Sequence, residues 1–195
     1  YGLGFIITRE MWEDNQYAEL GLRRTKSLAF SMKQTKETVA ANLFNRATNT
    51  SYTYADGKPL IATDRPFYGG GGVWRNKLDT AADLSEAALE QAAIDIGDFR
   101  DERGNQIKVM PQKLIIHREN QFNAARILRS TNRVGVDFND INALKALNVM
   151  DSDPIINHYF TDADAWFIKT DCPDGLKCKQ RRDVEFGDDS DFETE

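Results

Sequence analysis

Apolar and polar positions follow a helical spacing over one long stretch, from Thr8 to Ala47. This stretch contains no proline, and its apolar residues recur at intervals of three, four and seven, as along one face of a helix. Thr8 is placed to cap the first turn through its hydroxyl. Asn15 or Gly21 is the expected position of a break or bend. The apolar positions are Leu28, Met32, Val39, Ala40, Leu43, Phe44 and Ala47.

A helix of this length exceeds what the core of a single small domain needs. Residues 17–46 alone would extend about 45 Å, at roughly 1.5 Å per residue. The apolar stripe is narrow and the other faces are polar, so the pattern does not predict a membrane span. A helix that outruns its own core is typical of a larger assembly or of the spine of a flat, extended subunit.

The rest of the pattern predicts shorter elements in an irregular order. Strands are expected at 1–7, 114–116, 153–160, 165–169 and 182–186, and shorter helices at 83–98, 119–129 and 140–147. The strand at 114–116 is apolar at every residue, which predicts a central strand buried on both faces. This order indicates an α+β fold and not a regular alternation of strand and helix.

The shorter helices have predicted caps and buried faces. Asp83 or Ser85 is the expected cap of the first of them, and Asp140 of the last. The buried face of the first is predicted to comprise Leu84, Ala87, Ala88, Leu89, Ala92 and Ile96. That of the second is predicted to comprise Phe122, Ala125 and Leu128, with Arg126 and Arg129 beside it.

Four consecutive glycines, Gly69–Gly72, lie in a loop of about twenty residues with no predicted element. Glycines can bring backbone N–H groups against a phosphate, but a phosphate loop also needs a following Lys-Ser or Lys-Thr. Here Val73–Asn76 follow, so a surface loop is the better interpretation. Val134–Val136 is interpreted as a short edge strand or a loop.

Charge is distributed unevenly along the chain. The formal net charge is −6, but the last thirteen residues contain seven acids and no base, so the remainder is nearly neutral. Basic residues gather instead on the predicted long helix, at Arg23, Arg24, Lys26, Lys33 and Lys36. We interpret these five as a candidate inter-subunit or DNA-facing surface; the alternative is an ordinary solvated helix face.

The two cysteines, Cys172 and Cys178, do not have the spacing of a zinc site. Reduced thiols flanking a turn at Pro173–Gly175 are expected, which fits an intracellular assembly compartment. There is no signal-peptide pattern and no apolar run long enough to cross a membrane. Because the chain begins with Tyr1 in a strand-like segment, we expect it to start inside a longer protein.

No pattern of reactive residues predicts catalysis. His117 and His158 are the only histidines, and neither lies within metal-ligand spacing of another. Asp151 and Asp153 lack the glycine and the terminal glutamate of a calcium loop. We therefore predict no catalytic residue, no metal and no cofactor. The alternative hypothesis is a monomeric α/β enzyme or ligand-binding domain that uses the glycine loop and His117.

Seven segments then occur in a familiar order. They are Ile7–Asn15, Asp56–Leu60 with Asp64–Pro66, Asp83–Leu89, Pro111–Ile116, Ala124–Leu128 and Asp162–Phe167. In order and spacing they resemble the major capsid proteins of tailed bacteriophages, and the nearest likeness is to the Mu-type major head subunit. The resemblance covers most of the chain.

The resemblance implies the Hong Kong 97-type capsid fold. Residues 1–59 would belong to a peripheral domain with 8–47 as its spine helix, 60–175 would form the axial domain, and 176–195 would return to the peripheral domain through Val184–Phe186. The family usually has an N-terminal arm and an extended hairpin before the spine helix, and a further C-terminal strand. None of these lies in this sequence, as expected if both ends are truncated.

The resemblance also implies a function. The protein would be a structural subunit that forms hexamers and pentamers of an icosahedral shell around double-stranded DNA. Its partners would be further copies of itself, packaged DNA by non-specific contact, and scaffolding, portal and decoration proteins, with no membrane involved. It would be assembled in the host cytoplasm and reside in the virion capsid.

Overall fold

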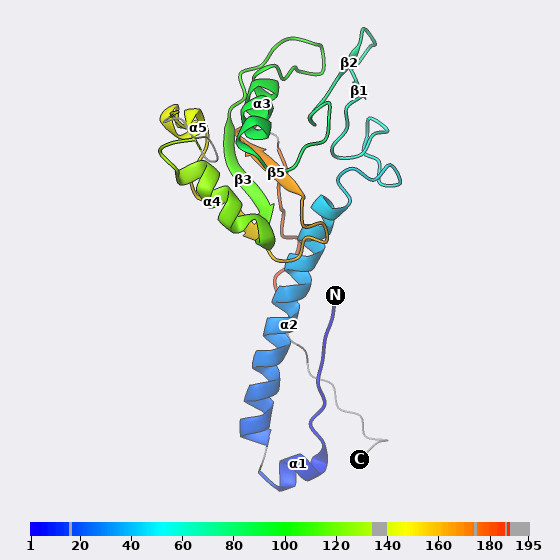
Figure 1. The fold of residues 1–195 in the computed structure, drawn as a ribbon. Helices are drawn as coiled ribbons and strands as arrows, with labels where there is room; N and C mark the ends of the chain where they lie inside the picture. Colours follow the sequence, from blue (N-terminus) through cyan, green and yellow to red (C-terminus); the bar gives the residue numbers. More distant parts are fainter. Residues whose placement is uncertain (16, 134–139, 174, 186, 188–195) are drawn as a thin grey trace. The chain divides into compact units, whose positions relative to one another are not determined.

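The computed structural model describes residues 1–15, 17–133, 140–173, 175–185 and 187. The chain divides into two compact units. Unit 1 consists of Tyr1–Ala40 together with the chain from Leu176 onward, and unit 2 consists of Ala41–Gly175. Figure 1 shows the elements of each unit along the chain. The predicted piece at 134–136 lies outside the described residues.

Two helices take the place of the single long helix predicted from the sequence. Helix α1 spans Arg9–Glu13 and helix α2 spans Tyr17–Asn45. The break falls near Asn15, one of the two predicted positions, where the backbone is left-handed with φ of 54°. Asparagine tolerates this conformation better than most residues. Gly21 remains inside α2, and Thr8 caps α1 as predicted, its hydroxyl 3.4 Å from the Met11 amide nitrogen.

The two terminal segments predicted as strands do not form strands in the described residues. Residues 1–8 have no ladder hydrogen bonds, and neither do residues 182–185. Phe186, the end of the second predicted strand, lies outside the described part. The sequence has strand character, but a strand exists only where a second backbone supplies the ladder bonds. The N-terminal segment is instead held to α2, where Arg24 Nη1 donates to the Ile6 carbonyl at 2.6 Å.

A three-stranded sheet lies at the centre of unit 2. Strand β3, Pro111–His117, pairs in parallel with β4, Ile155–Asn157, and antiparallel with β5, Trp166–Thr170. The predicted central position of 114–116 is therefore confirmed. Strand β4 is shorter than the predicted 153–160, because the chain turns directly after Asn157.

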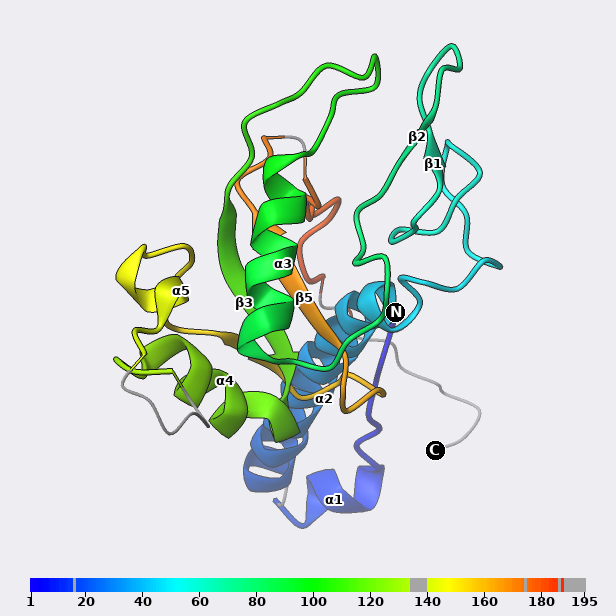
Figure 2. The same ribbon diagram turned by 45° about the horizontal axis from the view of Figure 1, so that its top comes forward.

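Helices cover one face of this sheet. Leu114 and Ile116 of β3 are fully buried and pack with α3, Glu86–Gly97, α4, Gln121–Arg129, and α5, Ala143–Ala146. Figure 2 shows α3 lying across β3 and β5. The core cluster also contains Leu84, Leu89, Ala124, Ile127, Leu128, Leu144 and Met150.

The opposite face of the sheet contacts the last residues of α2, which belong to unit 2. The Phe44 ring lies 5.2 Å from that of Phe167 in β5 and 5.7 Å from that of Phe160. Asn45 reinforces this contact, since its side chain donates to the Tyr159 carbonyl and accepts from the Thr161 amide. The C-terminal end of the long helix is thus part of the sheet's packing.

The buried faces of α3 and α4 differ in part from the predicted ones. On α3 the prediction holds except at Ala87, which is exposed. On α4 the buried residues are Ala124, Ile127 and Leu128, whereas Phe122 is 68% exposed. At about 100° per residue, Phe122 lies roughly 140° from Ile127, so one helix face cannot bury both. The pair Ile127 and Leu128 takes the core position.

The cap of α5 is Asn142 and not the predicted Asp140, which is exposed. Asn142 is only 1% exposed. Its amide donates to the carbonyls of Ile127, at 2.5 Å, and Ser130, at 3.2 Å, and its oxygen accepts from the Lys145 amide at 3.3 Å. A carboxylate at this position could not donate to the two carbonyls, so the buried site requires asparagine.

The loop predicted to be irregular contains a hairpin. Strands β1, Arg65–Pro66, and β2, Val73–Trp74, pair antiparallel, and Gly69–Gly72 all have positive φ between them. Arg65 organises this region: it pairs with Asp56 at 2.6 Å and donates to the Leu60 and Pro59 carbonyls. The glycines supply the left-handed conformations that the hairpin tip needs.

Replacing each of the two candidate caps of α5 by alanine, in separate variants, shows which one caps the helix. Asn142→Ala should lower the free energy of unfolding by about 1–3 kcal/mol, because two carbonyls and an amide lose their buried partner. Asp140→Ala should change it by less than about 0.5 kcal/mol, as expected for a surface position. Urea unfolding followed by circular dichroism measures both, and equal effects would contradict the assignment of Asn142.

Candidate assembly surface

The five basic residues of α2 are all exposed, but they do not share one face. At about 100° per residue, four of them fall within an arc of roughly 140° on one side of the helix. These four, Arg23, Lys26, Lys33 and Lys36, are called the basic face here. Arg24 lies outside this arc, on the side of the helix that meets the N-terminal segment.

Arg24 has a structural partner. Its guanidinium donates to the Ile6 carbonyl, and the next residue, Ile7, lies close to Gly21 one turn earlier in α2. The Ile7 Cδ1 atom is 3.8 Å from where a Cβ on Gly21 would stand. Arg24 therefore stabilises the packing of the N-terminal segment of unit 1 along α2.

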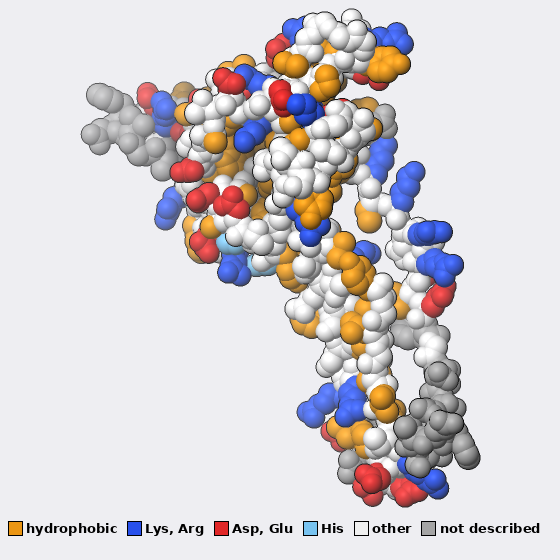
Figure 3. Space-filling view, turned by 90° about the vertical axis from the view of Figure 1, so that its right-hand side faces the viewer, with side chains coloured by type: hydrophobic (Ala, Val, Ile, Leu, Met, Phe, Trp, Pro, Cys, Tyr) orange, Lys and Arg blue, Asp and Glu red, His pale blue; other side chains and the backbone are white. Residues whose placement is uncertain are grey.

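Two large apolar residues lie within the arc of the basic face. Leu22 is 66% exposed and Phe30 is 63% exposed. Together with Lys26 they follow one another at intervals of four residues, so Leu22, Lys26 and Phe30 lie almost in line along α2. Figure 3 shows hydrophobic side chains at the surface of this helical part, close to Lys and Arg side chains.

Sequence reasoning missed Leu22 and Phe30 because neither fits the predicted apolar stripe. Their own four-residue spacing with Lys26 is the signal that could have identified them. Glu19 and Glu37 fall within the same arc, so the face is a mixed surface with an excess of positive charge. Exposed apolar side chains among charges are typical of a surface that another macromolecule covers.

Comparison with known proteins identifies the family. A family model described as phage capsid protein matches residues 1–194. The chain belongs to the phage capsid protein family. Comparisons with curated proteins and with solved structures gave no match.

Membership of this family makes the chain a structural capsid protein whose place is the virion capsid. It confirms the resemblance to phage capsid proteins, while the mixed helices and sheets confirm the predicted α+β class. No helix in the described part of the capsid protein is long and apolar enough to cross a membrane.

The structure assigns local roles to the groups considered for the alternative enzyme hypothesis. His117 is buried at the end of β3, where its Nδ1 accepts a hydrogen bond from the Glu119 amide at 3.2 Å. His158 is exposed and lies just past β4. Two open depressions in unit 2, one around Met110 and one around Arg75, include neither His117 nor the four glycines.

The acidic pair Asp151 and Asp153 is engaged within the chain. The Asp151 carboxylate accepts from the Asp153 amide at 3.0 Å and pairs with Lys113 at 3.0 Å. These two contacts, the backbone hydrogen bond first, hold the pKa of Asp151 below its usual value. Among the described residues, no group of three or more acidic, histidine or cysteine side chains is arranged to hold a metal ion.

Neighbouring arginines of α2 should respond differently to truncation. Arg24→Ala removes the hydrogen bond to the Ile6 carbonyl, so chymotrypsin cleavage after Phe5 should accelerate by about 2- to 10-fold, the equivalent of one hydrogen bond. Arg23→Ala is the matched control and should leave the cleavage rate unchanged. Equal cleavage rates in the two variants would contradict the proposal that Arg24 holds the N-terminal segment to α2.

Proposed function

We propose that this capsid protein forms an icosahedral shell of hexamers and pentamers around double-stranded DNA. Its fold in this proposal is of the Hong Kong 97 type, like that of the Mu-type major head subunit. The single observation that carries the proposal is the family match over residues 1–194. Helix α2, with 29 residues and a length of about 43 Å, suits the spine helix of that fold.

The proposal divides the chain into two domains. Residues 1–59 form the peripheral domain, 60–175 the axial domain at the centre of each capsomer, and 176–195 return to the peripheral domain. The grouping of the chain from Leu176 with Tyr1–Ala40 supports this division. Along the chain, unit 1 gives way to unit 2 within α2, after Ala40, which is nearer the N-terminus than the proposed boundary at 59.

Uncovered apolar side chains in the single chain support assembly with further copies. Large residues more than half exposed occur along the chain, in both units: Trp12, Leu22, Phe30, Ile94, Phe122, Ile141 and Leu147. Isolated exposed apolar residues are common, but Leu22 and Phe30 lie among charges along one helix side, as in protein interfaces. In this proposal neighbouring subunits cover part of this surface.

The basic face of α2 has two candidate partners within a capsid. One is the acidic C-terminal end of a neighbouring subunit, with seven acids in its last thirteen residues. The other is the phosphate backbone of packaged DNA, bound without sequence preference. We favour the neighbouring subunit, because Leu22 and Phe30 suit a protein surface better than a phosphate backbone.

The remaining parts of the proposal follow from a structural role. The protein acts without catalysis, metal or cofactor. Assembly takes place in the host cytoplasm, and scaffolding, portal and decoration proteins are the partners expected besides further copies and DNA.

Reversing charge on the basic face tests its role. The variant Arg23→Glu/Lys26→Glu/Lys33→Glu should reduce the yield of assembled particles by about tenfold or more, since repulsion replaces attraction at each of many repeated contacts. Particle yield is measured by sedimentation and electron microscopy, and DNA per particle by absorbance. Arg24 is left intact because of its bond to Ile6.

The matched control carries the same charge changes elsewhere, as Lys77→Glu/Arg103→Glu/Lys108→Glu at exposed positions of unit 2. Normal yield with reduced DNA per particle would assign the face to DNA in place of a neighbour. Normal yield together with normal DNA content would show that the basic face has neither role. Wild-type protein that never forms closed shells would contradict the proposed function itself.

A further inference from the structure

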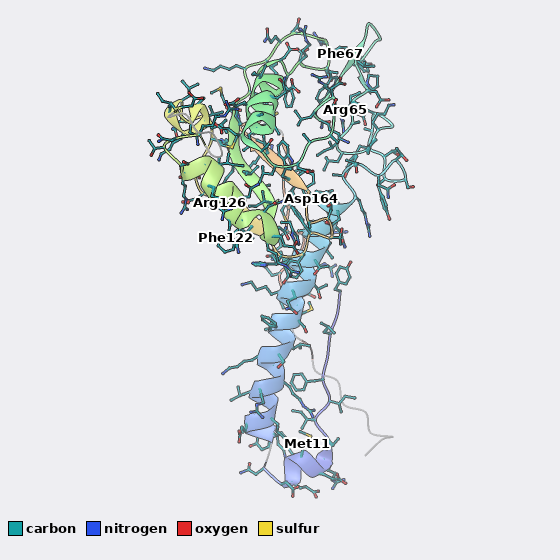
Figure 4. All side chains as sticks on the ribbon, viewed as in Figure 1. Met11, Arg65, Phe67, Phe122, Arg126 and Asp164 are labelled. Atoms are coloured by element: carbon teal, nitrogen blue, oxygen red, sulfur yellow. The ribbon has the colours of Figure 1, made fainter. Side chains whose placement is uncertain are left out.

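The outer side of α4 carries a regular basic and apolar pattern. Arg118, Phe122 and Arg126 follow one another at intervals of four residues, through the 3₁₀ turn Arg118–Asn120 and into α4. Figure 4 shows Phe122 and Arg126 projecting from the outer side of α4. Phe122 is 68% exposed, both arginines are exposed, and neither arginine has a partner among the described residues.

The outer side of α3 carries the same pattern with opposite charge. Glu90, Ile94 and Asp98 also follow one another at intervals of four residues. Ile94 is 66% exposed, and it lies about 160–200° around the helix from the buried Ala92 and Ile96. The Glu90 side chain is partly exposed without a partner in the described chain, and the Asp98 carboxylate pairs with the exposed Arg100, at 3.4 Å.

The two helix sides have patterns of equal length and opposite charge. Each pattern covers nine residues, and eight residue-to-residue steps correspond to about 12 Å along an α-helix. In each, a large apolar side chain stands between two charges of one sign. Within the described chain, no ion pair joins Glu90 or Asp98 to Arg118 or Arg126; the contact nearest to such a link is Glu86 with Arg133, at 3.6 Å.

The charge asymmetry extends over the surrounding sequence. Residues 79–102 contain eight acids and one base, whereas residues 103–133 contain seven bases and one acid. The acidic stretch includes α3 and the basic stretch leads through β3 into α4. One chain therefore presents both members of a complementary pair, and in the described residues the two members do not pair with each other.

We propose that the outer side of α3 in one copy of this chain docks on the outer side of α4 in a neighbouring copy. Ile94 packs against Phe122, and Glu90 and Asp98 pair with Arg118 and Arg126. The occupant is a second copy of this chain, because the complement of each surface is already present on the same molecule. Two different surfaces in contact are what a closed ring of subunits requires.

This proposal rests on the proposed function, because it supplies one contact within the capsomer. The apolar pair would exclude water, and the arginines would then act on carboxylates at reduced dielectric. Arginine suits this role because its planar fork binds a carboxylate through two hydrogen bonds. The contact is separate from the basic face of α2.

Charge exchange between the two surfaces tests the contact. Arg118→Glu/Arg126→Glu and Glu90→Arg/Asp98→Arg should each lower the assembled fraction by about tenfold or more. Combining all four substitutions should restore assembly to within about threefold of wild type, because the complementarity is rebuilt with its sign inverted. Lys77→Glu/Lys108→Glu, at exposed positions with no described partner, is the matched control for loss of positive charge.

Sedimentation velocity reports the size of the assemblies, electron microscopy reports closed shells, and circular dichroism confirms that each variant is folded. The contact is overturned if either reversal assembles like the control, or if the fourfold variant is no better than its parents. If wild type forms oligomers but no shells, the proposed function fails, and the exchange pattern in sedimentation still decides the contact. A wild type that stays monomeric overturns both.

Discussion

Burial of Leu114 and Ile116 on one face of β3 is the constraint on which unit 2 depends. Both side chains are fully buried, and α3, α4 and α5 all contribute residues to the cluster around them. Once these helices turn Leu89, Ile127 and Leu144 toward the strand, their opposite sides must face outward. The exposure of Ile94 and Phe122 is therefore a direct result of how the core is filled.

The part of α2 that belongs to unit 1 has no comparable constraint. Every described residue of α1 and of this part of α2 is partly or fully exposed, and neither contains a buried residue. Its stability cannot come from a core of its own, since most helical stability in proteins derives from packing. The Arg24 bond to the N-terminal segment is a small local substitute. In the proposed shell, contact with neighbouring subunits would supply the packing that this part of α2 lacks.

The sequence was sufficient to predict features that depend on interactions between residues close together in the chain. The cap at Thr8 and the central strand at 114–116 were predicted, and the cap at Ser85 and the break near Asn15 each fall at one of two predicted positions. Each depends on side chains and backbone groups a few residues apart, or on a run that is apolar throughout. The five basic residues of α2 were found from their positions on the predicted helix, and helical spacing separates Arg24 from the other four. Only the structure shows the contact of Arg24 to Ile6.

Features that depend on contacts between residues far apart in the sequence could not be predicted in this way. The pattern of α4 permits either Phe122 or Ile127 on the core side, and only the shape of the space over β3 selects Ile127 with Leu128. Asp140 and Asn142 are equally plausible caps by type, but two buried carbonyls from a different helix require a donor, and so Asn142 is used. In the described residues the strand-like ends are not paired, because a ladder needs a second backbone. By itself, the sequence determined the main helices, the central strand, their order and the capsid resemblance. It did not predict the β1–β2 hairpin, and it wrongly predicted strands at the ends of the chain. Tertiary packing decided which face of each helix in unit 2 is left exposed, because one core can cover only one side of a helix.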